Sequence, residues 1–182
     1  MIYHKVSNYN YIYSNRGMGL EDDLNSTNKY YLDNNIAVIY KKPTPITINK
    51  VNYNSRTDAV ITEAHFKVPS TTDYNGIYNG KYIDFEAKET KSKTSFPLNN
   101  IHNHQIEHLN KITSMGGIGF IIVRFTSLNE TYYLNSKKLD KFINTNKRKS
   151  IPIEYFKEEG YIIKPKLRPL VDYLEIVKDV EF

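Results

Sequence analysis

The segment YIDFEAKET, residues 82–90, reads as a short β-strand in which charged residues alternate with apolar ones. Because side chains along a strand alternate between its two faces, the apolar residues share one face and the charged residues share the other. The first face holds Ile83, Phe85 and Ala87, and the second holds Tyr82, Asp84, Glu86 and Lys88. We expect the first face to join the core, while the second either meets water on an edge strand or serves a chemical site.

A further acid lies across a predicted hairpin from this strand. The Asn79-Gly80 pair is a strong turn signal, and it joins the strand to a preceding strand at residues 74–78. Antiparallel pairing across the turn places Asp73 near Glu86. Two neighbouring carboxylates repel unless a cation lies between them, and oxygen ligands suit Mg²⁺ or Mn²⁺. With Lys88 beside them to stabilise charge on an attacked phosphate, the pattern predicts a metal-dependent phosphodiesterase.

The remaining patterns predict one α/β domain in which helices flank a mixed sheet. Periodic apolar residues predict helices at 15–35, 103–115, 136–146 and 169–180. Further strands are predicted at 36–40, of the buried type, at 118–125, in the sheet centre, and at 131–136. Two polar strands, 46–54 and 58–68, indicate a hairpin that projects from the sheet.

Bulk properties set limits on class and location. With 182 residues, of which 40% are hydrophobic, the chain is expected to form a single domain at 15–182 after a flexible segment at 1–14. The net charge of +5 favours an anionic partner such as nucleic acid. The absence of cysteine excludes disulfides and thiolate metal sites. Neither a long apolar run nor a signal-peptide pattern is found, so we expect a cytoplasmic protein without a membrane partner.

Five segments together resemble the RecU family, the Holliday junction resolvases of Gram-positive bacteria, their mycoplasma relatives and some phages. They are NRGMGLEDDLNSTNKYY, IAVIYKKPTPI, STTDYNGIYNGKYIDFEAKET, SFPLNNIHNHQIEHL and GIGFIIVRF. The resemblance is close from residue 15 to 125 and looser to Tyr173. Asp73 followed at twelve residues' spacing by Glu86-Ala87-Lys88 also resembles the motif of the restriction-endonuclease-like superfamily. One departure is Thr72, which stands before Asp73 where that motif has proline.

The resemblance implies a homodimer that binds a four-way DNA junction and makes paired, symmetric nicks with Mg²⁺ or Mn²⁺. By motif, Thr71, Asp73 and Glu86 match metal-site positions, and Gln105 completes that site. Lys88 matches the residue that stabilises the transition state. Asp84 shares the face of Glu86 without being a ligand in the family, and it is expected either to support the site or to contact solvent.

The same resemblance assigns DNA contacts, with the polar segment at about 43–68 corresponding to a stalk that enters the junction. Phe66 either stacks on a strained base or packs within the hairpin. In the stalk, Arg56 and Lys67 are candidate phosphate contacts. Near the cleft, the candidates are Arg16, Lys91 and Lys93, with a solvated surface as their alternative role.

Several other interpretations stay open or are set aside. His104 and His108 have the i, i+4 spacing of a zinc pair, but no third ligand is evident. Glu21 is a minor candidate for the metal site, because some relatives of the superfamily use a helix glutamate there. A non-catalytic junction-binding protein that modulates the RecA recombinase is one alternative function, and a related restriction or repair nuclease is another. The intact Asp73, Glu86 and Lys88 argue against the former, and the stalk argues against the latter.

Overall fold

The computed structural model describes residues 19–53, 55, 58–66 and 71–182. The flexible segment expected at 1–14 therefore lies outside the described residues. Within the described ranges, no helix is both long and apolar enough to cross a membrane.

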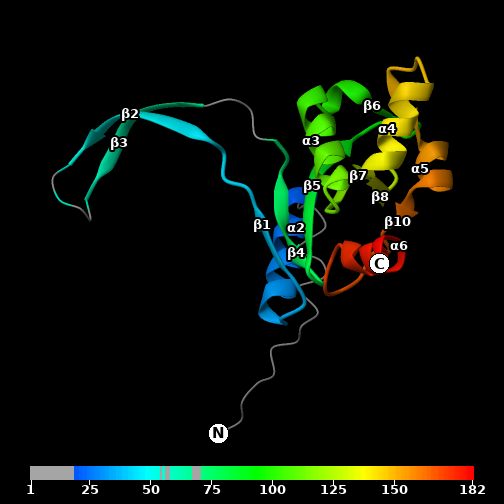
Figure 1. Ribbon diagram of the computed structural model, residues 1–182, viewed down its shortest axis with the longest axis horizontal. Coiled ribbons are helices and arrows are strands. Elements are labelled where there is room, and N and C mark those ends of the chain that lie inside the picture. Colours follow the sequence, from blue (N-terminus) through cyan, green and yellow to red (C-terminus); the bar gives the residue numbers. More distant parts are fainter. Residues whose placement is uncertain (1–18, 54, 56–57, 67–70) are drawn as a thin grey trace, which may run out of the picture.

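A six-stranded mixed sheet forms the centre of the body (Figure 1). In spatial order its strands are β1 (Val38–Lys41), β4 (Tyr74–Tyr78), β5 (Lys81–Thr90), β7 (Ile118–Phe125), β8 (Glu130–Asn135) and β10 (Tyr161–Ile162). Only β5 and β7 run parallel, and the other neighbours are antiparallel. The predicted mixed sheet is confirmed, and so is the central place of the apolar segment 118–125.

Helices cover both faces of this sheet. On one face, α2 (Leu20–Asp33) and α6 (Tyr173–Glu181) pack against the apolar side of β5. On the other face lie α3 (Asn103–Ser114), α4 (Ser136–Thr145) and α5 (Ile153–Glu159). A small second sheet of β6 (Ser95–Pro97) and β9 (Ser150–Pro152), with the 3₁₀ helix η1 (Leu98–Asn100), completes that layer. The charged side of β5 consequently faces α3, where Asp84 and Glu86 are buried while Tyr82 is exposed and Lys88 is half-buried.

A row of aromatic rings ties four strands together on the α2 and α6 face. Ring centroids lie 4.8 Å apart for Tyr74 and Phe85, 4.7 Å for Phe85 and Phe120, and 4.6 Å for Phe120 and Tyr133. Tyr173 of α6 packs on this row at 5.0 Å from Phe85. Each such pair adds about 1 kcal/mol beyond the burial of its apolar area. The row therefore holds β5 firmly between its neighbours.

The predicted hairpin is present and extends away from the body (Figure 1). It consists of β2 (Ile46–Asn52) and β3 (Val60–Phe66), which pair antiparallel with a register shift near Lys50. Nearly every described side chain of both strands is exposed. The hairpin thus offers both faces to a partner outside the body.

Three expectations about elements were incomplete or wrong. The strand predicted as buried at 36–40 is the edge strand β1, with Val38 and Tyr40 48% and 54% exposed, because only alternate residues face α2. The C-terminal helix begins at Tyr173 and not at 169, since Val171 forms a bridge with Pro165. The short helix α5 was missed because seven residues are too few to show a periodic stripe.

We predict that Gly76→Ala lowers the free energy of unfolding by about 3 kcal/mol, because overpacking forces neighbours apart. A Cβ at this position of β4 would lie 2.0 Å from the carbonyl oxygen of Val38 and 2.6 Å from Cα of Ile39. The control is Gly80→Ala, where φ is +77° but a Cβ meets no atom within 4 Å, and about 1 kcal/mol is expected. Urea unfolding measures both variants, and equal losses would contradict the clash.

Candidate active site

The hairpin of β4 and β5 brings the two predicted acids together. In its register Tyr74 pairs with Phe85, so Asp73, one residue before β4, lies opposite Glu86. The Asp73 Oδ2 atom accepts the backbone N–H of Ala87 at 3.1 Å, which holds this carboxylate against β5. The structure thus produces the pair of neighbouring carboxylates that the sequence indicated.

Glu86 is fully buried, and both of its carboxylate oxygens lack a hydrogen-bond partner among the described residues. Lys88 Nζ lies 2.5 Å from Oε1 as an ion pair, outside hydrogen-bonding geometry. Burial and the nearby Asp73 carboxylate raise the pKa of Glu86 to about 7, and Lys88 acts in the opposite direction. The ion pair with Lys88 therefore compensates this buried charge only in part, because the net effect of the surroundings is a raised pKa.

These two acids fit a hard divalent cation. A cation would add to the partial charge compensation that Lys88 gives Glu86 and would offset the repulsion from Asp73. No group of three or more His, Cys, Asp and Glu side chains suited to a metal occurs in the described part of the chain. An ion at this place would therefore combine two carboxylates with neutral oxygens and water, as Mg²⁺ commonly does.

Comparison with known proteins places the chain in a family. The family model described as Recombination protein U matches residues 15–179. The chain belongs to the RecU family. Relatives named Holliday junction resolvase RecU, from Bacillus thuringiensis (strain Al Hakam) and Bacillus mycoides (strain KBAB4), are each 52% identical over 182 residues. Each alignment covers 98% of this chain and 91% of the relative.

Among solved structures, this RecU-family chain is similar to Hjc of Archaeoglobus fulgidus, described as a Holliday junction resolvase from an archaeal hyperthermophile. The TM-score is 0.44 at 12% sequence identity. The superposition covers 77% of this chain and 90% of Hjc.

The other two predicted ligands occupy different surroundings. Gln105 is buried in the first turn of α3, where its Oε1 accepts the backbone N–H of His102 at 2.9 Å. An amide oxygen has two lone pairs, so this capping bond leaves one of them for a cation. Thr71 is exposed, and its hydroxyl accepts a hydrogen bond from Lys42 Nζ at 3.2 Å. Metal ligation by Thr71 and Gln105 stays a prediction.

The predicted DNA contacts are only partly described. Arg16, Arg56 and Lys67 lie outside the described residues. Lys91 and Lys93 are exposed just beyond the end of β5. Phe66 is 81% exposed, which argues against packing within the hairpin, and it pairs with Ile46 at the end of the hairpin that adjoins the body. Contact with DNA by all of these residues stays a prediction.

The other candidate metal ligands, which are Glu21, His104 and His108, contact residues other than Asp73 and Glu86. Glu21 is exposed and forms an ion pair with Lys41. The His104 ring stacks on His102, with 5.4 Å between centroids. His108 instead turns toward Asp84, with 3.1 Å between Nε2 and Oδ2. The two helix histidines therefore engage separate neighbours, which does not support a zinc pair.

Asp84 is fully buried, so of its two expected roles solvent contact is excluded and support of the site remains. Four side chains surround its carboxylate: those of Lys42, Thr72, Tyr82 and His108. Sequence reasoning missed this cluster, since its members carry no spacing motif. The only available signal was the place of Asp84 on the face of Glu86.

We predict that the metal-free protein loses stability as pH rises through neutrality, and that Glu86→Gln removes most of this loss. The Glu86 pKa rises from 4.5 to about 7 on folding, so the folded state holds this proton more tightly. The contribution of this proton to the free energy of unfolding is fully present below pH 4.5 and is lost as pH rises through 7. The full contribution amounts to about 3 kcal/mol.

Urea unfolding in EDTA at pH 5 and pH 8 measures this effect. The matched control is Glu107→Gln, an exposed acid on α3, which should keep the pH dependence of the parent protein. An E86Q variant with the parent's full pH dependence would show that Glu86 is not the responsible group.

Proposed function

We propose that this chain is a Holliday junction resolvase, an endonuclease that uses Mg²⁺ or Mn²⁺ to nick four-way DNA junctions during recombination and repair. The observation that carries the proposal is that the half-buried Asp73 lies beside the fully buried Glu86, whose oxygens have no hydrogen-bond partner among the described residues and whose ion pair is with Lys88. The names of relatives that are 52% identical over nearly the whole chain support the same activity.

In this mechanism each residue has a distinct task. Asp73 and Glu86 would hold the ion, which would supply a bound water of lowered pKa and a positive charge beside the phosphate. Asp73 is oriented by the Ala87 N–H, which donates to its Oδ2 atom and holds the carboxylate beside β5. Lys88 leaves Glu86 to stabilise the negative charge that builds on the attacked phosphate. Thr71 and Gln105 are the proposed neutral oxygen ligands.

The hairpin supplies the proposed means of recognising the junction. It stands away from the body with exposed apolar side chains, and Phe66 is available to stack on a base. Lys91 and Lys93, with Arg16, Arg56 and Lys67, are proposed to contact phosphates. Paired nicks need two active centres, so we propose a homodimer acting in the cytoplasm. Interaction with the RecA recombinase stays a prediction.

A cleavage assay tests this function by comparing a mobile four-way junction with linear duplex of the same sequence. With Mg²⁺ we expect symmetric paired nicks in the junction, no cleavage of the duplex, and no cleavage of either DNA in EDTA. Equal cleavage of both DNAs would instead indicate a restriction or repair nuclease. Junction binding without any cleavage would indicate a non-catalytic binding protein.

We further predict that Asp73→Asn and Glu86→Gln each lower the nicking rate by at least about 100-fold, because each removes charge that positions the ion beside the phosphate. Junction affinity should stay within about threefold, since contacts to the DNA backbone and its shape dominate binding. Gel-shift and single-turnover assays measure the two quantities, with Glu107→Gln as the control. Undiminished cleavage by both variants would refute the site.

A further inference from the structure

The hairpin stalk leaves and rejoins the body at a single place, where one lysine contacts both connections. Lys42 lies just before residue 43, where the stalk begins, and Thr71 and Thr72 follow its return. Lys42 Nζ donates to the hydroxyls of Thr71 at 3.2 Å and of Thr72 at 2.6 Å. The Lys42 backbone N–H also donates to the carbonyl oxygen of Asp73 at 2.7 Å. The two connections are thus tied to each other.

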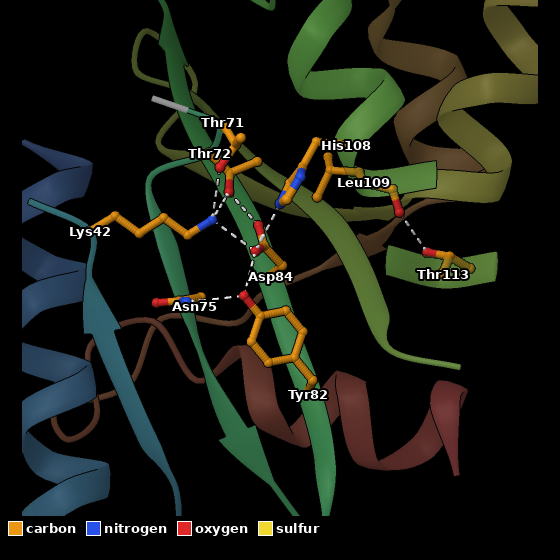
Figure 2. Close-up of polar contacts among 9 residues, drawn as sticks. All are labelled: Lys42, Thr71, Thr72, Asn75, Tyr82, Asp84, His108, Leu109 and Thr113. Carbon is orange, nitrogen blue, oxygen red and sulfur yellow. Dashed lines mark hydrogen bonds and ion pairs between the residues drawn. The ribbon is translucent and has the colours of Figure 1, made fainter. Parts of the chain in front are cut away.

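Asp84 fastens these connections to the sheet. Its Oδ2 accepts from Lys42 Nζ at 2.8 Å, from the Tyr82 hydroxyl at 2.9 Å, and contacts His108 Nε2 at 3.1 Å. Its Oδ1 accepts the hydroxyl of Thr72. These groups come from the end of β1, from β5, from α3 and from the returning connection, and they converge on one carboxylate (Figure 2). A buried carboxylate depends on such donors, so removing one group disturbs the others.

The cluster also adjoins both acids of the active site through the backbone. Thr72 immediately precedes Asp73, and Asp84 lies two residues before Glu86 on the same face of β5. A shift of Lys42 or Thr72 would therefore move the Asp73 carboxylate relative to Glu86. Groups that hydrogen-bond to a metal ligand and orient it commonly change metal affinity or activity by about 10- to 100-fold when they are mutated.

We propose that Lys42 and Asp84 form a clamp that fixes the stalk on the body and holds Asp73 in register with Glu86. Asp84 is then a positioning residue, and it touches neither the ion nor the DNA. The consequence for cleavage rests on the function proposed above, whereas the mechanical role does not. A stalk held in this way would also transmit the position of bound DNA to the reacting centre.

A clamp can be distinguished from an ion pair that only stabilises the fold by the effect of breaking it. Breaking an ion pair of that kind would lower the free energy of unfolding and leave the stalk of the folded protein where it was. Breaking a clamp frees the stalk in a protein that is otherwise folded. The ion pair between Asp23 and Arg124 is a matched control, because it is 2.7 Å long, largely buried, and joins α2 to β7 on the opposite face of the sheet.

Spin-label distance measurements test the mechanical role without metal, DNA or turnover. Because the chain has no cysteine, labels can be placed at Lys50→Cys in the stalk and Lys137→Cys on α4, both at exposed positions. With the clamp intact we expect a narrow distance distribution. Asp84→Asn and Lys42→Gln should at least double its width, Lys42→Arg should restore it, and Asp23→Asn should leave it narrow.

The cleavage assay provides the second measurement. Asp84→Asn and Lys42→Gln should lower the nicking rate by about 10- to 100-fold and raise the Mg²⁺ concentration needed for half-maximal rate, with K42R restoring both. D23N should change neither quantity. If the parent chain fails to cut junctions while the distances change as expected, the proposed function fails and the clamp stands.

Unchanged distance distributions in both D84N and K42Q would overturn the clamp, as would a broad distribution in the parent protein. Should D84N or K42Q fail to fold, the double variant K42Q/D84N carries the test, because it leaves neither member of the buried ion pair charged without its partner. Broadening in D23N equal to that in D84N would also overturn the proposal, since it would reflect general loosening.

Discussion

The register of the β4–β5 hairpin decides which side chains meet in this protein. Asn79 and Gly80 both adopt positive φ, at 46° and 77°, which allows a two-residue turn that matches the twist of the strands. That turn aligns Tyr74 with Phe85 and thereby Asp73 with Glu86. Because side chains alternate along a strand, a slip by one residue would exchange the buried rings of β5 with its charges.

The charged face of β5 shows how neighbouring acids acquire different roles from their surroundings. Asp84 and Glu86 lie on the same face and are both fully buried. Donors from four elements surround the Asp84 carboxylate, whereas neither oxygen of Glu86 has a hydrogen-bond partner among the described residues. The first is stabilised by the fold itself, whereas the second forms an ion pair with Lys88 and, in the mechanism proposed here, would also bind the divalent ion. A structural carboxylate and a reactive one can thus stand two residues apart.

The body and the stalk of this RecU-family protein differ in what fixes their positions. The body buries its aromatic rings against the sheet, so the positions of Asp73 and Glu86 depend on packing across several strands. The stalk has its two strands in solvent and depends on its attachment for a defined direction. In the mechanism proposed here, Lys42 and Asp84 lie where these two parts join.

The sequence by itself determined the features that depend on local alternation and tight turns: the core face with Ile83 and Phe85, the central strand 118–125, and the approach of Asp73 to Glu86. Asp73 and Glu86 are thirteen residues apart across a single hairpin, so antiparallel pairing by itself predicts that they lie close together. The tertiary structure alone decided that the strand at 36–40 is an edge and that Asp84 is buried. Asp84 meets Lys42 and His108, which lie 42 and 24 residues away. No periodicity joins residues so distant, because only the packing of helices and strands into layers brings them together.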